Sequence, residues 1–332
     1  MSVPAPSREV HPVRVQSPRF DDMDTMASAM IGTHVNFVPL RPGPFHGRFC
    51  QIDLDGLVLR RMVHGPLLIH GTATPDHVAL QLMARPADGL TLNGDAFGAS
   101  TLSVIPGGSE IQAICPAEHD RIALVVRADV FGRLIELCDV PAFPRDTHQM
   151  LHVHDSQAGV LVRAFGAMTD LAESLPKLLA VPGLGEALTE ECQRLIATVL
   201  TGTGDRSERP RRTKDMLRQV GAADEFLRAN IGRPIYTDEL CTALHVSART
   251  LHQSFAAVYG MSPHAYLKRR RLILVHRALR AAREDRAMVK AIALAHGFWH
   301  LGRFAQEYAA MFGEMPSETL YSGRSRAGSA MA

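Results

Sequence analysis

The sequence has 332 residues, of which 46% are hydrophobic and 21% are charged, which is typical of a globular protein with two or three domains. It lacks an apolar run of about 18 residues and begins without the apolar segment of a signal peptide, so neither a membrane-spanning helix nor a secreted protein is expected. Its five cysteines are scattered without a CxxC pair, which favours reduced thiols and a cytoplasmic location.

The net charge of +2 is divided unevenly along the chain. Residues 205–332 contain 21 Lys and Arg against 12 Asp and Glu, a net charge of +9, whereas residues 1–204 contain 15 against 22, a net charge of −7. A basic part joined to an acidic part indicates that the C-terminal part meets a polyanion.

The N-terminal part begins with residues 1–19, rich in Pro, Ser and Arg, which are predicted to be a disordered tail. Residues 20–203 are predicted to form one domain. Short runs with alternating or β-branched apolar residues, bounded by Gly, Pro, Asp or Asn, predict strands of an antiparallel sandwich or barrel. These runs are 34–40, 48–54, 57–63, 77–84, 101–105 and 121–126. From Arg127 onward, three segments with helical periodicity follow the strands.

Residues 204–212 are predicted to be a linker, because the stretch TGTGDRSERPRRT contains no large apolar residue. The change in charge occurs at the same place. After it, residues 213–321 have helical periodicity throughout, and residues 322–332 are predicted to be a second disordered tail.

An internal repeat occupies the helical part. YGMSPHAYL, starting at Tyr259, and FGEMPSETL, starting at Phe312, share an aromatic residue, Gly, Pro and Leu at an offset of 53 residues. A helix with the same apolar face precedes each segment, and a shorter helix, TDELCTAL or MVKAIALA, precedes that one. Short helix, turn and longer helix together predict a helix-turn-helix, here in two copies.

The two copies are joined by a long predicted helix that starts at Pro263 with Ser262 as its N-cap. A helix of about 20 residues spans ~30 Å, close to the ~34 Å between successive major-groove faces of B-DNA. The predicted fold class is therefore α+β, with a β-barrel domain bearing helices and an all-α domain of two helix-turn-helix modules on a rigid strut.

Residues 213–321 resemble the DNA-binding domain of AraC/XylS-family transcription regulators, most clearly through the segment AIALAHGFWHLGRFAQEYAAMFGEMPSETL. GFWHLGRF followed by PSETL is similar to the branch that contains ethanolamine-operon regulators. RPGPFHGRF, GPLLIHG and VIPGGSE resemble the cupin-like sensory domain of that branch. The resemblance implies that residues 20–203 sense an effector, dimerise through their helices, or both, although the barrel could equally cover the apolar faces of these helices.

The second helix of each module is expected to read DNA, because its N-terminal part faces the base edges. The predicted DNA-binding residues are Ser247, Ala248, Arg249, His252 and Gln253 in the first module and His300, Leu301, Arg303 and Gln306 in the second. Arginine suits guanine and glutamine suits adenine. The family's base-reading positions map to Arg249, His252, Gln253, Leu301, Arg303 and Gln306. Lys268 and Arg269, at the start of the strut, are predicted to meet phosphates.

Three residues near the turns raise specific expectations. His245 stands where the family usually has Gly, at a left-handed position that suits histidine less well. Gly302 lowers the helix propensity near the start of the second recognition helix. Trp299, the one tryptophan, is expected to pack at the turn.

Sixteen histidines raise the question of a metal site in the barrel. The one HxH pair, His152 and His154, follows the predicted strands, while His64, His70 and His77 are spaced six and seven residues apart. Neither a nucleophile elbow nor a glycine-rich phosphate loop is present. No metal, cofactor or enzymatic activity is therefore expected.

The sequence predicts a cytoplasmic, sequence-specific transcription regulator, an activator that responds to a small-molecule effector. Its expected partners are double-stranded DNA, an unidentified effector, a second copy of the chain and, by family resemblance, RNA polymerase. Two alternatives stay open: a cupin-type metal enzyme with an accessory nucleic-acid-binding domain, and a DNA binder that needs no effector.

Overall fold

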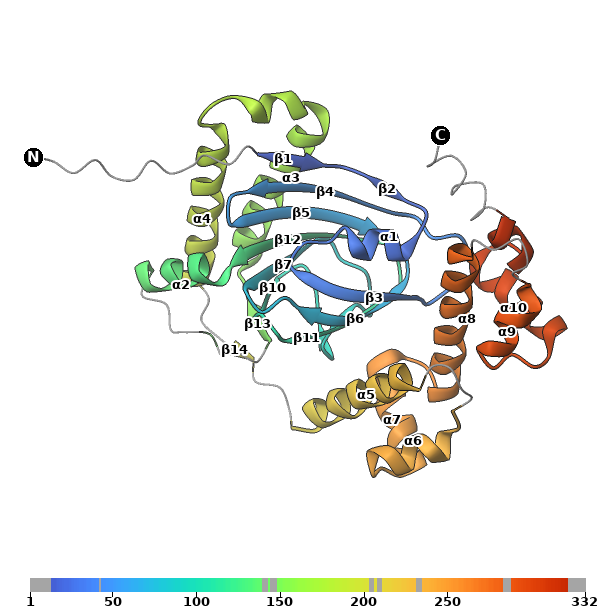
Figure 1. Ribbon diagram of the computed structural model, residues 1–332. Helices are drawn as coiled ribbons and strands as arrows, with labels where there is room; N and C mark the ends of the chain where they lie inside the picture. Colours follow the sequence, from blue (N-terminus) through green and yellow to red (C-terminus); the bar gives the residue numbers. More distant parts are fainter. Residues whose placement is uncertain are drawn as a thin grey trace, which may run out of the picture.

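Two antiparallel sheets pack face to face and form the N-terminal part of the protein (Figure 1). The computed structural model describes residues 13–41, 43–138, 143, 148–202, 206–207, 211–230, 235–282 and 288–321. The larger sheet has the order β1-β4-β5-β12-β7-β10-β13-β14, with β2 also paired to β4, and the smaller has the order β3-β6-β11-β8-β9. The larger sheet consists of β1 (Arg14–Gln16), β2 (Arg19–Phe20), β4 (Gly47–Leu54), β5 (Leu57–His64), β7 (His77–Arg85), β10 (Thr101–Ile105), β12 (His119–Arg127), β13 (Gln149–His152) and β14 (Arg206–Ser207). The smaller consists of β3 (Thr33–Pro39), β6 (Leu67–Ala73), β8 (Thr91–Leu92), β9 (Asp95–Ala96) and β11 (Glu110–Cys115).

All six expected strands are present, as β3, β4, β5, β7, β10 and β12, with ends within two residues of those expected. Their alternating side chains bury one set between the sheets, around Phe37, Met62 and Ile69. The other face of the larger sheet is covered by helices. Two longer strands, β6 and β11, were not expected, although the alternation of Ile111, Ala113 and Cys115 is a strand signal.

The helices after the barrel are α2 (Ala128–Leu137), α3 (Asp155–Ser174) and α4 (Leu184–Gly202), with a 3-10 turn at Pro176–Ala180 and a short α1 (Met23–Ser28) earlier in the chain. Leu161 and Phe165 of α3 and Leu195 of α4 are buried in one cluster with Leu59 and Leu124 of the larger sheet. The larger sheet thus covers the apolar faces of α3 and α4, one of the two arrangements that the sequence left open.

The ends of the N-terminal domain differ from the expected boundaries. Residues 1–19 were expected to be disordered, but Arg14–Gln16 forms β1, antiparallel to β4, and Arg19 pairs with Arg48. Backbone hydrogen bonds to an existing strand need no apolar pattern in the sequence, which explains why the composition of residues 1–19 did not predict β1. Within the expected linker 204–212, Arg206–Ser207 pairs with β13 as β14, and α5 begins at Arg211. The rest of that linker and the tail 322–332 lie outside the described residues, apart from the backbone of residues 211–212 in α5.

The C-terminal part is helical, with α5 (Arg211–Ala229), α6 (Thr237–Leu244), α7 (Ala248–Tyr259), α8 (Pro263–Ala281), α9 (Val289–Ala295) and α10 (Leu301–Phe312). Figure 1 shows α8 standing between the group α5–α7 and the group α9–α10. The core of this part contains Leu251, Phe255, Phe304 and Tyr308, the inward residues that the repeat predicts. No described helix combines the length and the apolar character needed to cross a membrane.

Candidate nucleic-acid interface

Two helix pairs, α6–α7 and α9–α10, repeat the same backbone design. α7 and α10 each have 12 residues, and their bounds differ by the 53 residues of the sequence repeat. Each ends at a glycine in the left-handed conformation, Gly260 with φ of 63° and Gly313 with φ of 77°. Glycine adopts this conformation without the steric penalty of a Cβ, so the repeated punctuation has a backbone cause.

The turn between α6 and α7 confirms the expectation for His245, which has a φ of 52° and ends α6 in the left-handed region. Ser247 then caps α7, accepting a hydrogen bond from the Thr250 amide at 3.1 Å. The second turn is longer, since α9 ends at Ala295 and α10 begins at Leu301. Trp299 was expected to pack at this turn, but it is 66% exposed, because Phe298 fills the position against Phe304 with ring centroids 5.0 Å apart.

The outward side of α7 carries the residues expected to read DNA. Ser247, Ala248, Arg249, His252 and Gln253 are all exposed, while Leu251 and Phe255 are fully buried on the opposite side. The equivalent side of α10 exposes His300, Arg303 and Gln306, and half-buries Leu301. Both helices therefore combine one apolar face held in the core with one exposed polar face that carries Arg, His and Gln side chains.

Arg303 is held in part by an acid on its own helix. Its Nε donates to Glu307 Oε1 at 3.0 Å, and the same oxygen accepts from Lys268 Nζ at 3.0 Å. Partial burial opposes ionisation of Glu307, but the hydrogen bonds from the two cations outweigh it and lower the pKa of this carboxyl group. Lys268, expected to meet phosphate, thus lies beside α10 and shares one counter-ion with Arg303.

Arg269, also expected to meet phosphate, contacts the N-terminal domain instead of facing solvent. Its Nη1 donates to the Pro39 carbonyl oxygen of β3 at 2.8 Å. Burial lowers the pKa of its guanidinium group. Further along α8, Arg277 donates from Nε to Asp24 Oδ2 at 2.6 Å, and Arg280 forms an ion pair with Asp22. One side of the long helix therefore docks on the N-terminal domain.

A cavity of about 350 Å³ lies at this junction. Residues from both domains line it, including Arg41, His46, His276, Arg280 and Glu314. Burial, followed by the nearby Arg280 charge, lowers the pKa of His276. The cavity thus offers cationic, neutral and acidic groups to a small molecule that touches both domains at once.

The barrel contains a second candidate site, which the sequence did not predict. His64 was considered without its neighbours, Cys115 was treated only as one of the scattered thiols, and His119 was not considered. The three come from different strands, so the sequence does not show that they meet. Burial lowers the pKa of His64 well below its ordinary value and that of His119 to about 4. Burial also raises the pKa of the Cys115 thiol to about 12. The short spacing of Cys115 and His119, with three residues between them, was the feature of the sequence that could have indicated this site.

Two helix pairs with exposed polar faces, in the basic part of the chain, are typical of the class of helix-turn-helix DNA-binding proteins. Residues 240–321 match the family described as "Helix-turn-helix domain". Through this segment the chain belongs to the AraC/XylS family of transcription regulators. The matched residues begin at Leu240 inside α6 and include all of α7, α8, α9 and α10.

Relatives and solved structures agree with this family. The chain is 35% identical over 96 residues to the XylDLEGF operon transcriptional activator 2 of Pseudomonas putida, covering 29% of this chain and 61% of the relative. It is 35% identical over 101 residues to the probable thc operon regulatory protein of Rhodococcus erythropolis, covering 30% of each. The crystal structure of a probable AraC family transcriptional regulator from Rhodopseudomonas palustris is 39% identical, with 32% of this chain and 98% of that chain covered and a TM-score of 0.30. The chain thus spans less than two thirds of the length of these curated relatives. The resemblance to the ethanolamine branch stays a prediction.

Proposed function

We propose that the chain is a sequence-specific, double-stranded-DNA-binding transcription regulator in which α6–α7 and α9–α10 are two helix-turn-helix modules. The observation that carries this proposal is that both repeated helices, α7 and α10, expose Arg, His and Gln side chains on the side away from the core, with Gln253 and Gln306 at equivalent positions of the repeat. A repeated buried face alone would serve stability. The packing of the core does not require exposed Arg, His and Gln side chains on both helices, and such side chains pair with base edges.

In this proposal α7 reads the first half of the site. Arg249 donates two hydrogen bonds to guanine, Gln253 pairs with adenine, and His252 meets a base or a phosphate. Ser247 and Ala248 lie at the N-terminal end of the helix, where the backbone approaches the phosphate chain. All five residues are exposed and so need no rearrangement of the core to reach DNA.

α10 then reads the second half with Arg303 and Gln306, flanked by His300 and Leu301. The Arg303 side chain is 74% exposed, so its ion pair with Glu307 is weak. Leaving Glu307 to bind a guanine costs Arg303 about 1 kcal/mol or less. Lys268, released from the same acid, is placed to meet a phosphate. Arg269 becomes available to phosphate when its contact with Pro39 opens.

Control by an effector is proposed through the junction between the domains. The cavity of about 350 Å³ is lined from both sides, so a small molecule in it would stabilise one arrangement of the two domains over others. We propose that the N-terminal domain is a cupin-like sensory barrel that includes β1 and β14, and that the helical part from α5 onward is the second functional unit. The regulator is proposed to act as a cytoplasmic activator with RNA polymerase as a partner. None of these roles requires enzymatic chemistry.

A homodimer is proposed on the side of α3 and the turn that follows it. The apolar faces of α3 and α4 are used by the larger sheet, but Leu175, Leu178 and Val181, at the end of α3 and in the turn that follows it, are exposed, between 39% and 56%. Apolar side chains gathered in this way on a surface suit a second copy of the chain. A dimer would place four reading helices on neighbouring sites.

The experiment that tests the function is selection of DNA from a random library with the purified full chain and with Arg249→Ala and Arg303→Ala. We expect one motif with two half-sites about one helical turn apart. Each variant should lose about 1–3 kcal/mol of base preference, and the two variants should lose it in different half-sites. Arg194→Ala, which removes a surface arginine from α4, is the matched control and should select the unchanged motif. Uniform, salt-sensitive binding without a motif would contradict sequence-specific recognition.

A further inference from the structure

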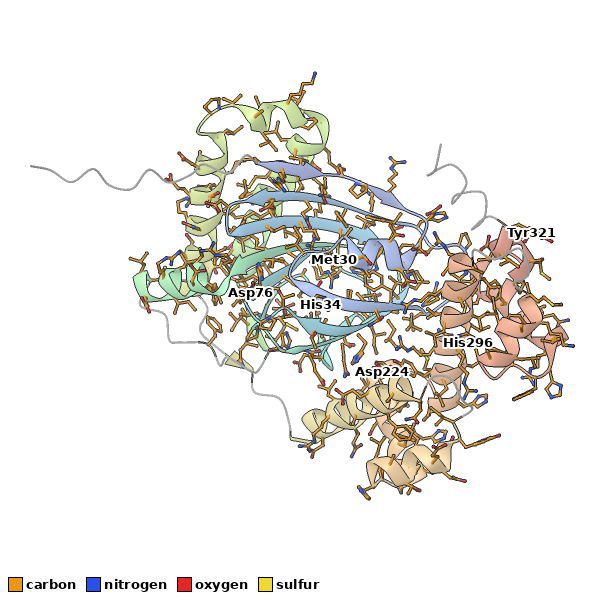
Figure 2. The ribbon with its side chains drawn as sticks, viewed as in Figure 1. Met30, His34, Asp76, Asp224, His296 and Tyr321 are labelled. Carbon is orange, nitrogen blue, oxygen red and sulfur yellow. The ribbon has the colours of Figure 1, made fainter. Side chains whose placement is uncertain are left out.

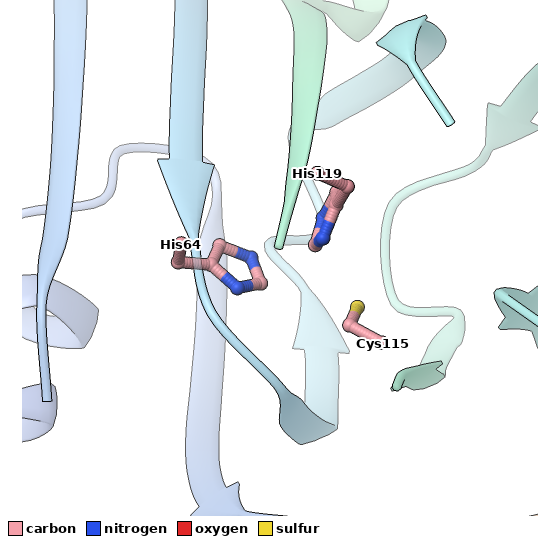
Figure 3. A group of neighbouring side chains, drawn as sticks. All are labelled: His64, Cys115 and His119. Atoms are coloured by element: carbon pink, nitrogen blue, oxygen red, sulfur yellow. The ribbon is translucent and has the colours of Figure 1, made fainter. Parts of the chain in front are cut away.

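We infer that His64, Cys115 and His119 form a binding site for one soft transition-metal ion inside the barrel, cuprous copper by preference. The ligand atoms of the three residues all lie within 4.8 Å of one another, and all three side chains are buried. Figure 3 shows the two imidazoles and the thiol turned toward a common space between neighbouring strands. The inference is independent of the DNA-binding function proposed above.

The strand pairing explains why these residues meet. His64 ends β5 and His119 begins β12, and the two are direct partners in the antiparallel ladder. Cys115 ends β11 in the opposite sheet. The three ligands therefore come from three strands of two sheets, and the side chains are held by rigid backbone. Such support gives a metal site its geometry before the ion arrives.

Backbone carbonyl groups hold both imidazoles in the form that a metal needs. Nδ1 of His64 lies 3.0 Å from the Gly65 carbonyl oxygen, and Nδ1 of His119 lies 3.4 Å from that of Ala117. A carbonyl oxygen can accept but not donate, so each Nδ1 carries the proton and each Nε2 keeps a lone pair. Both Nε2 atoms are buried and have no hydrogen-bond partner among the described residues. Two oriented, unpaired acceptors that are buried away from water are costly unless something binds them.

The donor set selects the class of metal. Two imidazole nitrogens and one sulfur suit copper, zinc or iron, and a thiolate favours the soft cuprous ion. Oxygen-preferring ions such as magnesium and calcium are disfavoured, because no carboxylate belongs to this group. On binding, Cys115 gives up its proton to solvent and its sulfur bonds the ion, while the two imidazoles coordinate without losing a proton.

Charge inside the barrel favours a monovalent ion. Two buried guanidinium groups lie in the same interior: Arg60 donates to Gln51 Oε1 at 2.8 Å, and Arg121 donates to Gln81 Oε1 at 3.2 Å, both neutral acceptors. A cuprous ion with one thiolate is neutral and leaves the charge of this interior unchanged. A zinc ion with one thiolate adds a positive charge beside these arginines, which a low-dielectric interior opposes.

The test measures binding of Cu(I), under reducing conditions, to the full chain in competition with a chromophoric Cu(I) chelator. We expect one ion per chain, and a loss of affinity of at least about 100-fold in Cys115→Ser and in His119→Gln. Cys50→Ser, which alters another buried thiol of the sheet, and His77→Gln, at the start of β7, are controls that should bind as the unaltered chain does. Equal affinity in all four variants would overturn the inference.

A second measurement does not depend on how the variants fold. X-ray absorption at the copper edge of the unaltered chain should show one sulfur and two nitrogen neighbours. A shell of sulfur alone, or of nitrogen and oxygen without sulfur, would contradict the assigned ligands. Zn(II) added alone should bind more weakly than Cu(I), and tighter zinc binding would overturn the preference for a monovalent ion.

Discussion

His70 on β6 and Asp224 on α5 meet across the junction between the two domains, with His70 Nε2 3.1 Å from Asp224 Oδ2. The Asp224 side chain is fully buried on the side of α5 that faces the sheets (Figure 2). Its other oxygen, Oδ1, accepts from the Tyr266 hydroxyl at 2.5 Å and lies 3.5 Å from Arg270 Nε. One buried carboxylate therefore connects the N-terminal sheet with α5 and α8 of the DNA-binding part.

Asp224→Asn should destabilise the protein strongly. The change leaves the buried Arg270 without its negative partner, and uncompensated buried charge costs about 3–5 kcal/mol. Chemical denaturation followed by fluorescence measures the loss. Asp215→Asn on the same helix removes an exposed acid paired with Arg218 and should change stability by less than about 1 kcal/mol. Equal effects of the two substitutions would show that Asp224 is not a structural centre.

Asp24→Asn should increase the affinity for DNA of any sequence. It weakens the ion pair that holds α1 on Arg277 of α8, so the N-terminal domain is released more readily and Arg269 is freed from Pro39. Each additional phosphate contact steepens the dependence of log affinity on log salt by about 0.9. Binding measured across a salt series tests this, with Asp76→Asn, an exposed acid of the N-terminal domain, as the control. An unchanged salt dependence would show that contact between α8 and the N-terminal domain does not limit DNA binding.

His245→Gly should stabilise the protein by about 0.5–1 kcal/mol. His245 ends α6 with a φ of 52°, a conformation that costs a residue with a Cβ about 1–2 kcal/mol, part of which is offset by the greater freedom of glycine in the unfolded chain. Thermal unfolding gives the comparison. Ala256→Gly, at an exposed position inside α7, should have the opposite sign and lose about 1 kcal/mol. A loss of stability in both variants would mean that His245 makes a contact that offsets its strain.

Gly302→Ala and Gly313→Ala should act in opposite directions, although both glycines belong to the second helix pair. A Cβ at Gly302 meets nothing within 4 Å, so alanine should add up to about 1 kcal/mol through its helix propensity. Gly313 has a φ of 77°, and a Cβ there would lie 3.3 Å from Pro44 Cδ, so alanine should destabilise by about 1 kcal/mol or more. Denaturant titration of the two variants side by side is the measurement. Stabilisation of the protein by alanine at Gly313 would contradict the left-handed cap.

The sequence by itself determined the elements whose causes are local. Strands such as β4 and β12 follow from alternating apolar residues, and α7 and α10 follow from two copies of one apolar stripe between defined caps. The exposure of Arg249 and Gln253 follows from the same stripe, because residues opposite a buried face must point outward. Local patterns of period two or 3.6 are sufficient for such predictions.

Only the tertiary structure decided what depends on residues far apart in the chain. The contact of Arg269 with Pro39 joins positions 230 residues apart, and nothing in KRRR shows which arginine faces another domain. The group of His64, Cys115 and His119 exists because two sheets close on each other, and β1 exists because β4 offers a free edge. Trp299 is exposed because Phe298 already fills the space at the turn. These outcomes follow from packing between segments, and their partners cannot be identified from either segment alone.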